Sequence, residues 1–432
     1  MSSETKANAA KDEARPARVP KLRFPEFRGA EGWKPVTLQQ ASTPVTERVG
    51  ERKLTPVSIS AGIGFVPQAE KFGRDISGNQ YQIYTLVSDG DFVYNKGNSL
   101  KFPQGCVYQL QGWGQVAAPN VFICFRLKDG YSNVFFQNCF EQNMHGKQIK
   151  KHITSGARSN GLLNISKENF FGVEIHTPSL AEQQKIAECL SSVDELMAAQ
   201  ARKVGALKTH KKGLMQQLFP TEGETQPRLR FPEFENAGDW AEKKLGSVCN
   251  IQRGKFSHRP RNDPRFFGGP YPFIQTGDVV KSEGGAVIAS QSLNEEGLAV
   301  SKLFKPTIVL ITIAANIGDT GLLQTDGCFT DSVVGLIPGK DVIPVFLELI
   351  MRGQKENLNK VATTGAQKNI NNEILREVCV LLPSLPEQHR IASCLSSLDA
   401  LITAETQKLD ALKTHKQGLM QQLFPSPEAL EA

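Results

Sequence analysis

The chain has 432 residues, of which 40% are hydrophobic and 22% are charged, and its formal net charge is +6. A single compact core rarely supports a chain of this length, so the length predicts two or three domains. The composition is typical of a globular protein, and no apolar run is long enough for a membrane-spanning helix or a secretory signal. The mild positive charge permits contact with nucleic acid without requiring it.

The eight cysteines are scattered along the chain, with no CxxC pair and no histidine at ligand spacing. Metal sites need clustered ligands, so this pattern predicts reduced, buried thiols and no metal site. We therefore expect a cytoplasmic location.

Residues 1–20 are polar and charged, and they predict a disordered tail. Residues 21–178 predict a first domain, in which apolar runs such as "YTLVSDGDFVYNKGN" alternate with glycine turns and indicate short strands. This domain carries a basic stretch with no acidic residue between His145 and Arg158. One such stretch is usually only a solvated surface, but each half of the chain has one, which favours contact with DNA.

Residues 179–220 predict one long helix. Its start, "PSLAEQQ", suits the positive end of a helix dipole, and the proline of "LFP" ends it. Apolar residues recur at alternating steps of four and three, which indicates a coiled-coil seam; an amphipathic helix packed on its own domain is the alternative. The seam consists of Ile186, Leu190, Val193, Met197, Val204, Leu207, Leu214 and Leu218, interrupted by Gln200 and Lys211.

Residues 221–383 predict a second domain that opens like the first. Both begin with "LRFPEF", followed at the same spacing by Trp33 or Trp240, but beyond this point the two blocks are unlike. The basic stretch of the second block, "IQRGKFSHRPRNDPR", contains one acidic residue. Arginine, asparagine and glutamine are the side chains that read base edges, and lysine and arginine neutralise phosphates.

Residues 384–425 repeat the first predicted helix, and residues 426–432 form a short tail. The phrase "ALKTHKQGLMQQLFP" differs from its earlier copy only in Gln417, which replaces Lys212. The second seam consists of Ile391, Leu395, Leu398, Ile402, Leu409, Leu412, Leu419 and Leu423, interrupted by Glu405 and Lys416. The repeated helices therefore perform one task twice, whereas the variable blocks perform two different tasks.

The two helices are expected to pair as an antiparallel coiled coil. We predict a register in which facing residue numbers add up to 616, which places Lys211 opposite Glu405 and Gln200 opposite Lys416. The predicted fold class is α+β: two mixed α/β domains separated by two long paired helices, with pseudo-twofold symmetry.

Motifs of common enzymes are absent from the sequence. There is no P-loop, no GxGxxG, no methyltransferase-like "PPY", no nucleophile elbow and no HExxH. We therefore predict no catalytic residue and no cofactor in this chain.

Several phrases together resemble the specificity (S) subunits of type I restriction–modification systems. They are "PSLAEQQKIA" and "PSLPEQHRIA", the long repeated helices, "TTGAQKNIN" before the second helix, and "PFIQTGDVV" at Pro272–Val280. The first half lacks a clear counterpart of "IQTGD", and its loop before the helix is longer.

This resemblance implies that two target recognition domains each read half of a bipartite, asymmetric DNA site. The helices would act as a spacer and dock two adenine-methyltransferase subunits, so that DNA methylation and bacterial defence depend on partners. Those modification subunits would bring S-adenosylmethionine, and restriction subunits would bring ATP and Mg. Half-sites about one helical turn apart, roughly 10 bp or somewhat more, are expected.

The predicted DNA contacts come from both domains. In the first they are Lys96, Lys151, Arg158 and Asn160, and in the second they are Arg253, Lys255, Gln275, Gln367 and Lys368. Three alternatives stay open: the specificity subunit of a related bifunctional restriction–methylase, a free-standing coiled-coil DNA-binding adaptor, and an enzyme whose active site has no familiar motif.

Overall fold

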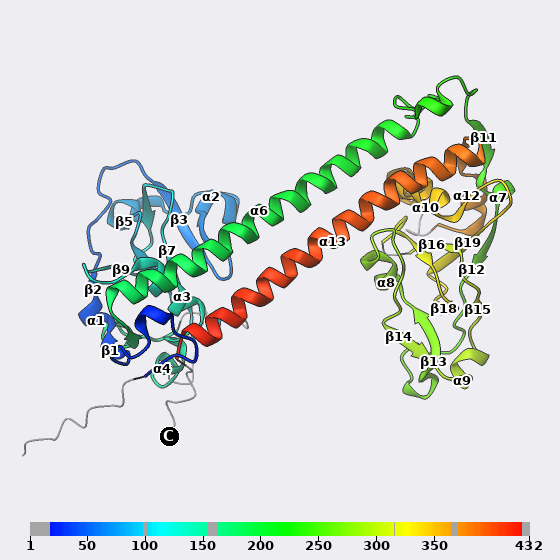
Figure 1. Cartoon of the computed structure of the whole chain (residues 1–432). Helices are drawn as coiled ribbons and strands as arrows, with labels where there is room; N and C mark the ends of the chain where they lie inside the picture. The colour runs from blue at the N-terminus through cyan, green and yellow to red at the C-terminus, as the bar shows by residue number, and fades with distance from the viewer. Residues whose placement is uncertain (1–17, 98–101, 154–162, 315, 364–369, 426–432) are drawn as a thin grey trace, which may run out of the picture. The chain divides into compact units, whose positions relative to one another are not determined.

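The structure is a computed structural model that describes residues 18–97, 102–153, 163–314, 316–363 and 370–425. The chain forms two compact units, each of which combines a β-rich block with parts of two long helices (Figure 1). The first unit consists of residues 1–201 and 408–432, and the second consists of residues 202–407. Most of the predicted N-terminal tail and the whole of the predicted C-terminal tail lie outside the described residues.

The first unit contains ten short strands and several short helices among its described residues. The strands are β1 (Lys34–Thr37), β2 (Ser42–Pro44), β3 (Thr55–Ser60), β4 (Gly64–Pro67), β5 (Thr85–Ser88), β6 (Phe92–Asn95), β7 (Cys106–Gln109), β8 (Gln115–Ala118), β9 (Ile123–Leu127) and β10 (Glu174–Thr177). The helices are η1 (Pro25–Phe27), α1 (Leu38–Ala41), α2 (Gln68–Phe72), η2 (Gly78–Ile83), α3 (Asn133–Glu141), α4 (Gly146–Lys150) and α5 (Lys167–Phe171).

The second unit has the same number of strands among its described residues. They are β11 (Ala241–Lys244), β12 (Cys249–Arg253), β13 (Phe267–Ile274), β14 (Gln291–Leu293), β15 (Leu303–Phe304), β16 (Ile308–Thr312), β17 (Thr320–Leu323), β18 (Gly327–Phe329), β19 (Val333–Pro338) and β20 (Cys379–Leu382). The short helices are η3 (Pro232–Phe234), α7 (Leu245–Val248), η4 (Pro264–Phe266), α8 (Thr276–Lys281), α9 (Glu295–Ala299), α10 (Pro344–Gly353), α11 (Lys355–Thr363) and α12 (Asn372–Glu377).

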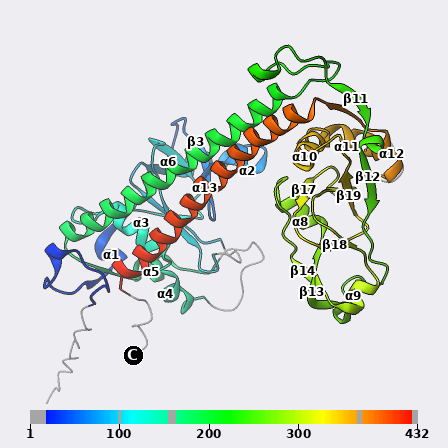
Figure 2. The same ribbon diagram turned by 45° about the vertical axis from the view of Figure 1, so that its right-hand side comes forward.

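The two blocks share one strand topology, although their sequences are unlike. The first unit has sheets ordered β2-β9-β6-β7 and β4-β3-β8-β5, and the second has β12-β19-β16-β17 and β14-β13-β18-β15. In each unit one pair, β3–β8 or β13–β18, is parallel and its neighbours are antiparallel. Figure 2 shows β13, β14 and α9 at one end of the second unit, with α10, α12 and β11 at the other.

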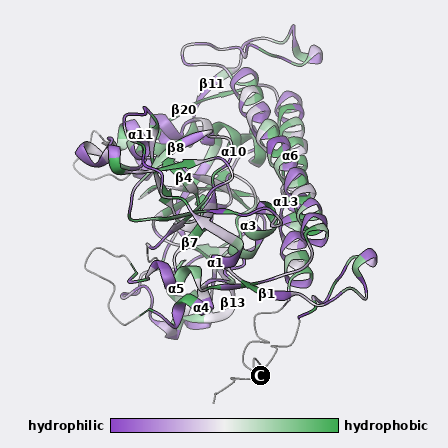
Figure 3. Cartoon of the chain, turned by 90° about the vertical axis from the view of Figure 1, so that its left-hand side faces the viewer, coloured by the Kyte–Doolittle hydropathy of each residue, from purple (hydrophilic) through white to green (hydrophobic). Residues whose placement is uncertain are grey.

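Two long helices carry the repeated sequence, α6 (Leu180–Leu218) and α13 (Leu385–Leu423). Both carry hydrophobic and hydrophilic residues in alternation along their length (Figure 3). The residues of the two predicted seams are all buried or half-buried, whereas Leu196 and Leu401, at equivalent positions outside the seams, are 58% and 43% exposed. The predicted class of two mixed α/β domains with two long antiparallel helices is confirmed: in each unit the first part of one helix lies beside the last part of the other.

The predicted register of the helix pair is wrong. In the second unit Lys211 lies 2.5 Å from Asp399, and Lys203 lies 3.1 Å from the buried Glu405. In the first unit Lys416 lies 2.8 Å from Asp194. The helices are therefore displaced from the predicted register by about one heptad.

A displacement of one heptad leaves the apolar seams in contact, so the seam pattern alone cannot distinguish the two registers. The acids that accept the two lysines, Asp194 and Asp399, lie beside the seam and not in it. Predicting the pairing from seam positions alone therefore joined Lys211 to the wrong acid.

No helix in the described part of the chain is long and apolar enough to cross a membrane. The cysteines are all free thiols, and five of the eight are buried, whereas Cys379 is exposed. Burial raises the pKa of each of the five buried thiols, including Cys106, whose pKa rises to about 11. Within the described ranges, no group of three His, Cys, Asp or Glu side chains could hold a metal ion.

Candidate nucleic-acid interface

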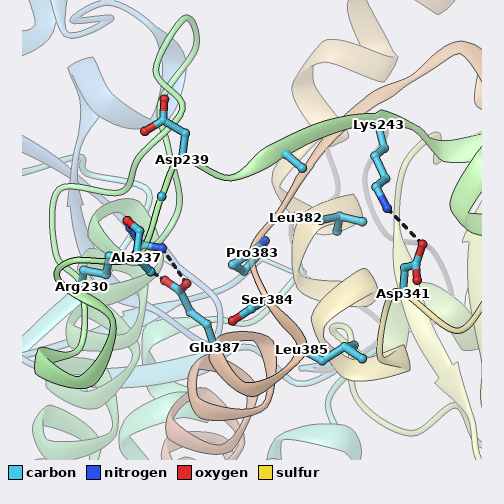
Figure 4. A pocket seen from close by; sticks show the side chains of 12 residues that line it. Arg230, Ala237, Asp239, Lys243, Asp341, Leu382, Pro383, Ser384, Leu385 and Glu387 are labelled. Carbon is cyan, nitrogen blue, oxygen red and sulfur yellow. Dashed lines mark hydrogen bonds and ion pairs between the residues drawn. The ribbon is translucent and has the colours of Figure 1, made fainter.

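Each β-rich block is anchored to a long helix by a buried ion pair. In the second unit Arg230 donates from Nε and Nη2 to the two carboxylate oxygens of Glu387, at 2.8 and 2.7 Å, beside a polar hollow of about 400 Å³ (Figure 4). The indole of Trp240 donates to the same carboxylate at 3.3 Å. The carboxylate is 1% exposed, and its hydrogen bonds raise the pKa of Arg230.

The first unit repeats this anchor with the same geometry. Arg23 donates to Glu182 at 2.8 and 2.7 Å, and Trp33 donates to Glu182 at 3.3 Å. The arginine belongs to "LRFPEF" and the glutamate to the phrase "PSL-x-EQ", so two phrases that are far apart in the sequence form one contact. Their recurrence is explained by anchoring and not by base reading.

The glutamine that follows each glutamate ties the helix start to the block. The side chain of Gln183 accepts from the Ser132 backbone at 3.0 Å, and that of Gln388 accepts from the Ile343 backbone at 3.1 Å. The two donors, Ser132 and Ile343, stand at the starts of α3 and α10. Each glutamine therefore fixes a short helix of the β-rich block against α6 or α13.

The "LFP" phrase completes the anchor from the other long helix of each unit. The ring of Phe219 lies 5.9 Å from Trp240 and 5.5 Å from Phe346. In the first unit Phe424 lies 5.9 Å from Trp33 and 5.3 Å from Phe135. Each block is therefore held by the start of one long helix and the end of the other.

Three predicted DNA contacts of the second unit, Arg253, Lys255 and Gln275, adjoin one turn, residues 330–332 between β18 and β19. The Lys255 backbone donates to Phe329 at 3.1 Å, and the Thr330 backbone donates to Ile274, the residue before Gln275, at 3.3 Å. Gly254 lies so close to the turn that an added Cβ would overlap the carbonyl oxygens of Phe329 and Thr330.

Basic side chains surround this turn. Arg253 donates from Nε to the backbone carbonyl of Asp331, while Arg259 and Arg261 lie 3.4 and 2.6 Å from its carboxylate. Lys255 is exposed, and its carbonyl accepts from Ser301, the neighbour of the exposed Lys302. The result is a basic surface of the second unit, formed by Arg253, Lys255, Arg259, Arg261 and Lys302.

An amide pair lies at the edge of this basic surface. Gln275 donates from Nε2 to Oε1 of Gln291 at 3.0 Å, and its backbone is held by Asp278 at 2.9 Å. The capping of α8 fixes the position of Gln275, and glutamine can read adenine bidentately. Gln367 and Lys368 lie outside the described residues; Ile370, which follows them, donates to Ile313, and Ile313 donates to Ser332 of the same turn.

The first unit presents fewer of its predicted contacts. Lys151 is exposed at the end of α4, next to the exposed Lys147 and Lys150. Lys96 is half-buried, with its ammonium 3.4 Å from the Ile165 carbonyl, so part of its hydrogen bonding is already internal. Arg158 and Asn160 lie outside the described residues.

The turn of the first unit between β8 and β9 also holds an arginine. Arg48 donates to Oδ1 of Asn120 at 2.5 Å and to the Ile83 carbonyl at 2.6 Å. Neither Arg48 nor Asn120 was predicted, and neither was Asp331. The sequence gives no signal for these residues, because the two turns are recognised as equivalent only from the strand order that the two units share.

A buried histidine lies just before α4 in the first unit. His145 packs against Tyr94 and Phe140, with ring centroids 6.2 and 5.6 Å away. Burial lowers the pKa of His145 to about 4, so the ring is neutral near pH 7. His145 therefore contributes apolar packing at the start of α4 and adds no positive charge beside the lysines of that helix.

The chain contains two copies of one mixed fold, one with a basic surface and one with a lysine-bearing helix, and each copy is followed in sequence by a long helix. This arrangement suits a two-domain DNA-recognition protein. The chain belongs to the family of type I restriction–modification DNA specificity domains, whose family model matches residues 114–209 and 237–414. Specificity subunits are the non-catalytic DNA-recognition components of these systems.

Similar proteins come from Methanocaldococcus jannaschii. The chain is 24% identical over 280 residues to a putative type I restriction enzyme MjaX specificity subunit, and the match spans 64% of each chain. It is 25% identical over 296 residues to the type I restriction enzyme MjaVIII specificity subunit, covering 64% of this chain and 67% of the relative.

Two solved structures share the fold. One, from work on complex assembly and conformational transition of the type I R-M system, covers 94% of this chain and all of its own, with a TM-score of 0.58 and 19% identity. The other is the type I restriction–modification S subunit from M. genitalium, which covers 94% of this chain and 99% of its own, with a TM-score of 0.56 and 14% identity. These likenesses concern the fold.

Proposed function

We propose that the two units read the two halves of a bipartite, asymmetric DNA site. The observation that carries this proposal is one strand topology built twice with unlike loops: the second unit gathers Arg253, Lys255 and Gln275 around the 330–332 turn, and the first exposes the lysines of α4. A shared framework with different loop side chains suits two different half-sites.

Direct contacts would divide into two kinds. Arginine and glutamine side chains on the second unit's basic surface are suited to base edges, and lysines to phosphates. Loss of a base-reading arginine should cost about 1–3 kcal/mol and relax one position of the site, whereas loss of a lysine should weaken all sequences alike.

Methylome sequencing of a host that carries the complete system tests this function. The expected result is methyladenine in two short specified blocks separated by several unspecified base pairs. A single continuous motif would contradict two separate readers, and a host without any new methylated motif would contradict a role in modification. Chromosomal modification that needs no separate methyltransferase would point to a bifunctional restriction–methylase.

The long helices are proposed to dock two copies of one methyltransferase subunit. Their outward leucines, Leu196 and Leu401, occupy the same position of the repeat and are exposed outside the seam. Equivalent apolar side chains on two copies of one surface suit two copies of one partner. S-adenosylmethionine would come with these subunits, and ATP and Mg with restriction subunits.

Stoichiometry of the co-purified complex tests the docking proposal. Leu196→Glu and Leu401→Glu should each remove one methyltransferase subunit, and the double variant should remove both, as measured by native mass spectrometry. Ile288→Glu is the matched control, because Ile288 is 82% exposed and lies outside the helices. Complexes of unchanged composition in the double variant would refute this docking surface, and a chain that binds its DNA site without any partner would favour a free-standing adaptor.

A further inference from the structure

The arginine-holding turns of the two units differ in charge. The turn between β18 and β19 holds its arginines through an aspartate, Asp331, whereas the corresponding turn between β8 and β9 holds one through an amide, Asn120. The two turns stand at the same place in the shared strand order, so the difference lies in the side chains and not in the framework.

In the second unit, hydrogen bonds fix the positions of Arg259 and Arg261, and Asp331 neutralises part of their charge. Nη1 of Arg259 donates to the carbonyls of Phe256 and His258, both at 2.8 Å, and its Nη2 faces Asp331. Arg261 donates from Nη2 to Asp331 at 2.8 Å. Within the described part of the chain Arg261 bonds through Nη2 alone, so its Nε and Nη1 have no acceptor there that would compete with DNA.

In the first unit the charge of the arginine is not balanced by its partner. Arg48 bonds to a neutral amide and to a backbone carbonyl, and Lys167 lies with it around a small hollow of about 70 Å³. A DNA phosphate could approach Arg48 without displacing a carboxylate.

We infer that Asp331 is a specificity-determining residue, which lowers the affinity of the second unit for DNA of arbitrary sequence. A phosphate that binds Arg259 or Arg261 must replace an existing ion pair, so the exchange gains little. A neutral base acceptor, such as O6 or N7 of guanine, can instead accept one hydrogen bond from Nε or Nη1 of Arg261 with Asp331 in place. The inference rests on the proposed function of the second unit as a DNA reader.

The test measures affinity of the assembled complex for two duplexes across a range of salt. One duplex carries the methylated motif found in the host, and the other has the second unit's half-site scrambled. Asp331→Asn should raise affinity for the scrambled duplex about tenfold and steepen its salt slope by about 1–2, since each freed arginine can neutralise roughly one phosphate. Affinity for the intact motif should change much less.

The reciprocal variant and a control complete the test. Asn120→Asp should make the salt slope shallower by about 1 on a duplex whose first half-site is scrambled. Asp326→Asn, which removes the same charge from the exposed Lys305 pair of 2.7 Å, should leave the ratio of the two affinities unchanged.

The inference would be overturned if either turn variant, Asp331→Asn or Asn120→Asp, changed the affinity for the intact motif and for its scrambled duplex equally. Loss of binding to the intact motif alone in either variant would also overturn it. A wild-type complex that binds both duplexes equally would instead contradict the proposed function.

Discussion

The repeated helices and the β-rich blocks are duplicated in different ways. The helices and their anchors recur residue by residue: Arg23, Trp33 and Glu182 meet at the same distances as Arg230, Trp240 and Glu387. The blocks recur in strand order alone, and their turns carry different side chains. Copies that keep the contacting side chains suit one task performed twice, whereas copies that keep only the framework suit two different targets.

The largest expected effect concerns the anchors. Glu182→Ala and Glu387→Ala each leave an arginine and an indole without their buried acceptor, so each should destabilise its unit by about 3–5 kcal/mol. Denaturant unfolding followed by tryptophan fluorescence measures this, because Trp33 and Trp240 touch the carboxylates.

An exposed ion pair gives the matched control for the anchors. Glu233 lies 2.9 Å from Arg390, and both side chains are about half exposed, so Glu233→Ala should leave the free energy of unfolding almost unchanged. If one anchor variant were as mild as this control while the other was severe, the residue-by-residue equivalence of the two anchors would be refuted.

A smaller effect is expected where the basic surface meets its turn. Gly254→Ala would press a methyl group against the carbonyls of Phe329 and Thr330, which should cost about 1–3 kcal/mol and displace the basic loop. Recognition of the second half-site should weaken while that of the first is kept, as measured by binding to duplexes with either half scrambled. Gly277→Ala, where nothing lies within 4 Å of an added Cβ, should change neither half; equal loss at both halves would argue against separate readers.

The smallest predicted effect separates the two units by pH. Because burial depresses the pKa of His145 from 6.5 to about 4, the unfolded chain takes up a proton first as the pH falls. The histidine therefore costs nothing above about pH 7 and should destabilise the first unit by about 2 kcal/mol at pH 5.

Unfolding of the first unit at pH 7 and pH 5 checks this difference. His145→Phe, which keeps an aromatic ring against Tyr94 and Phe140, should remove the histidine's share of the acid sensitivity. An unchanged loss of stability between the two pH values in this variant would show that other groups are responsible.

The helices were predictable from sequence because a heptad pattern sustained over many turns has one simple structural solution. Their register was not, since Asp194 and Asp399 decide it from beside the seam. The anchor was visible only in part: the recurrence of "LRFPEF" and of "EQ" was plain, but nothing in the sequence tells that Arg230 and Glu387 meet.

The strand order of the two blocks was beyond sequence reasoning for a different reason. Short strands are specified by tertiary contacts more than by local pattern, so two unlike sequences can encode one topology without a visible signal. The same holds for Asp331 and Asn120, whose importance follows from the turns they occupy. The contacts predicted at Arg158, Asn160, Gln367 and Lys368 lie outside the described residues and stay predictions.

The most direct test of the central claim exchanges one block for a copy of the other. In the altered chain, a second copy of residues 22–177 replaces residues 229–382. Arg23 and Trp33 of the inserted copy then contact Glu387 in place of Arg230 and Trp240. Methylome sequencing of a host with this chain should show a bipartite motif in which the first half-site stands twice and the second is lost. A motif that still contains the second half-site, in a complex that assembles and methylates, would contradict the account.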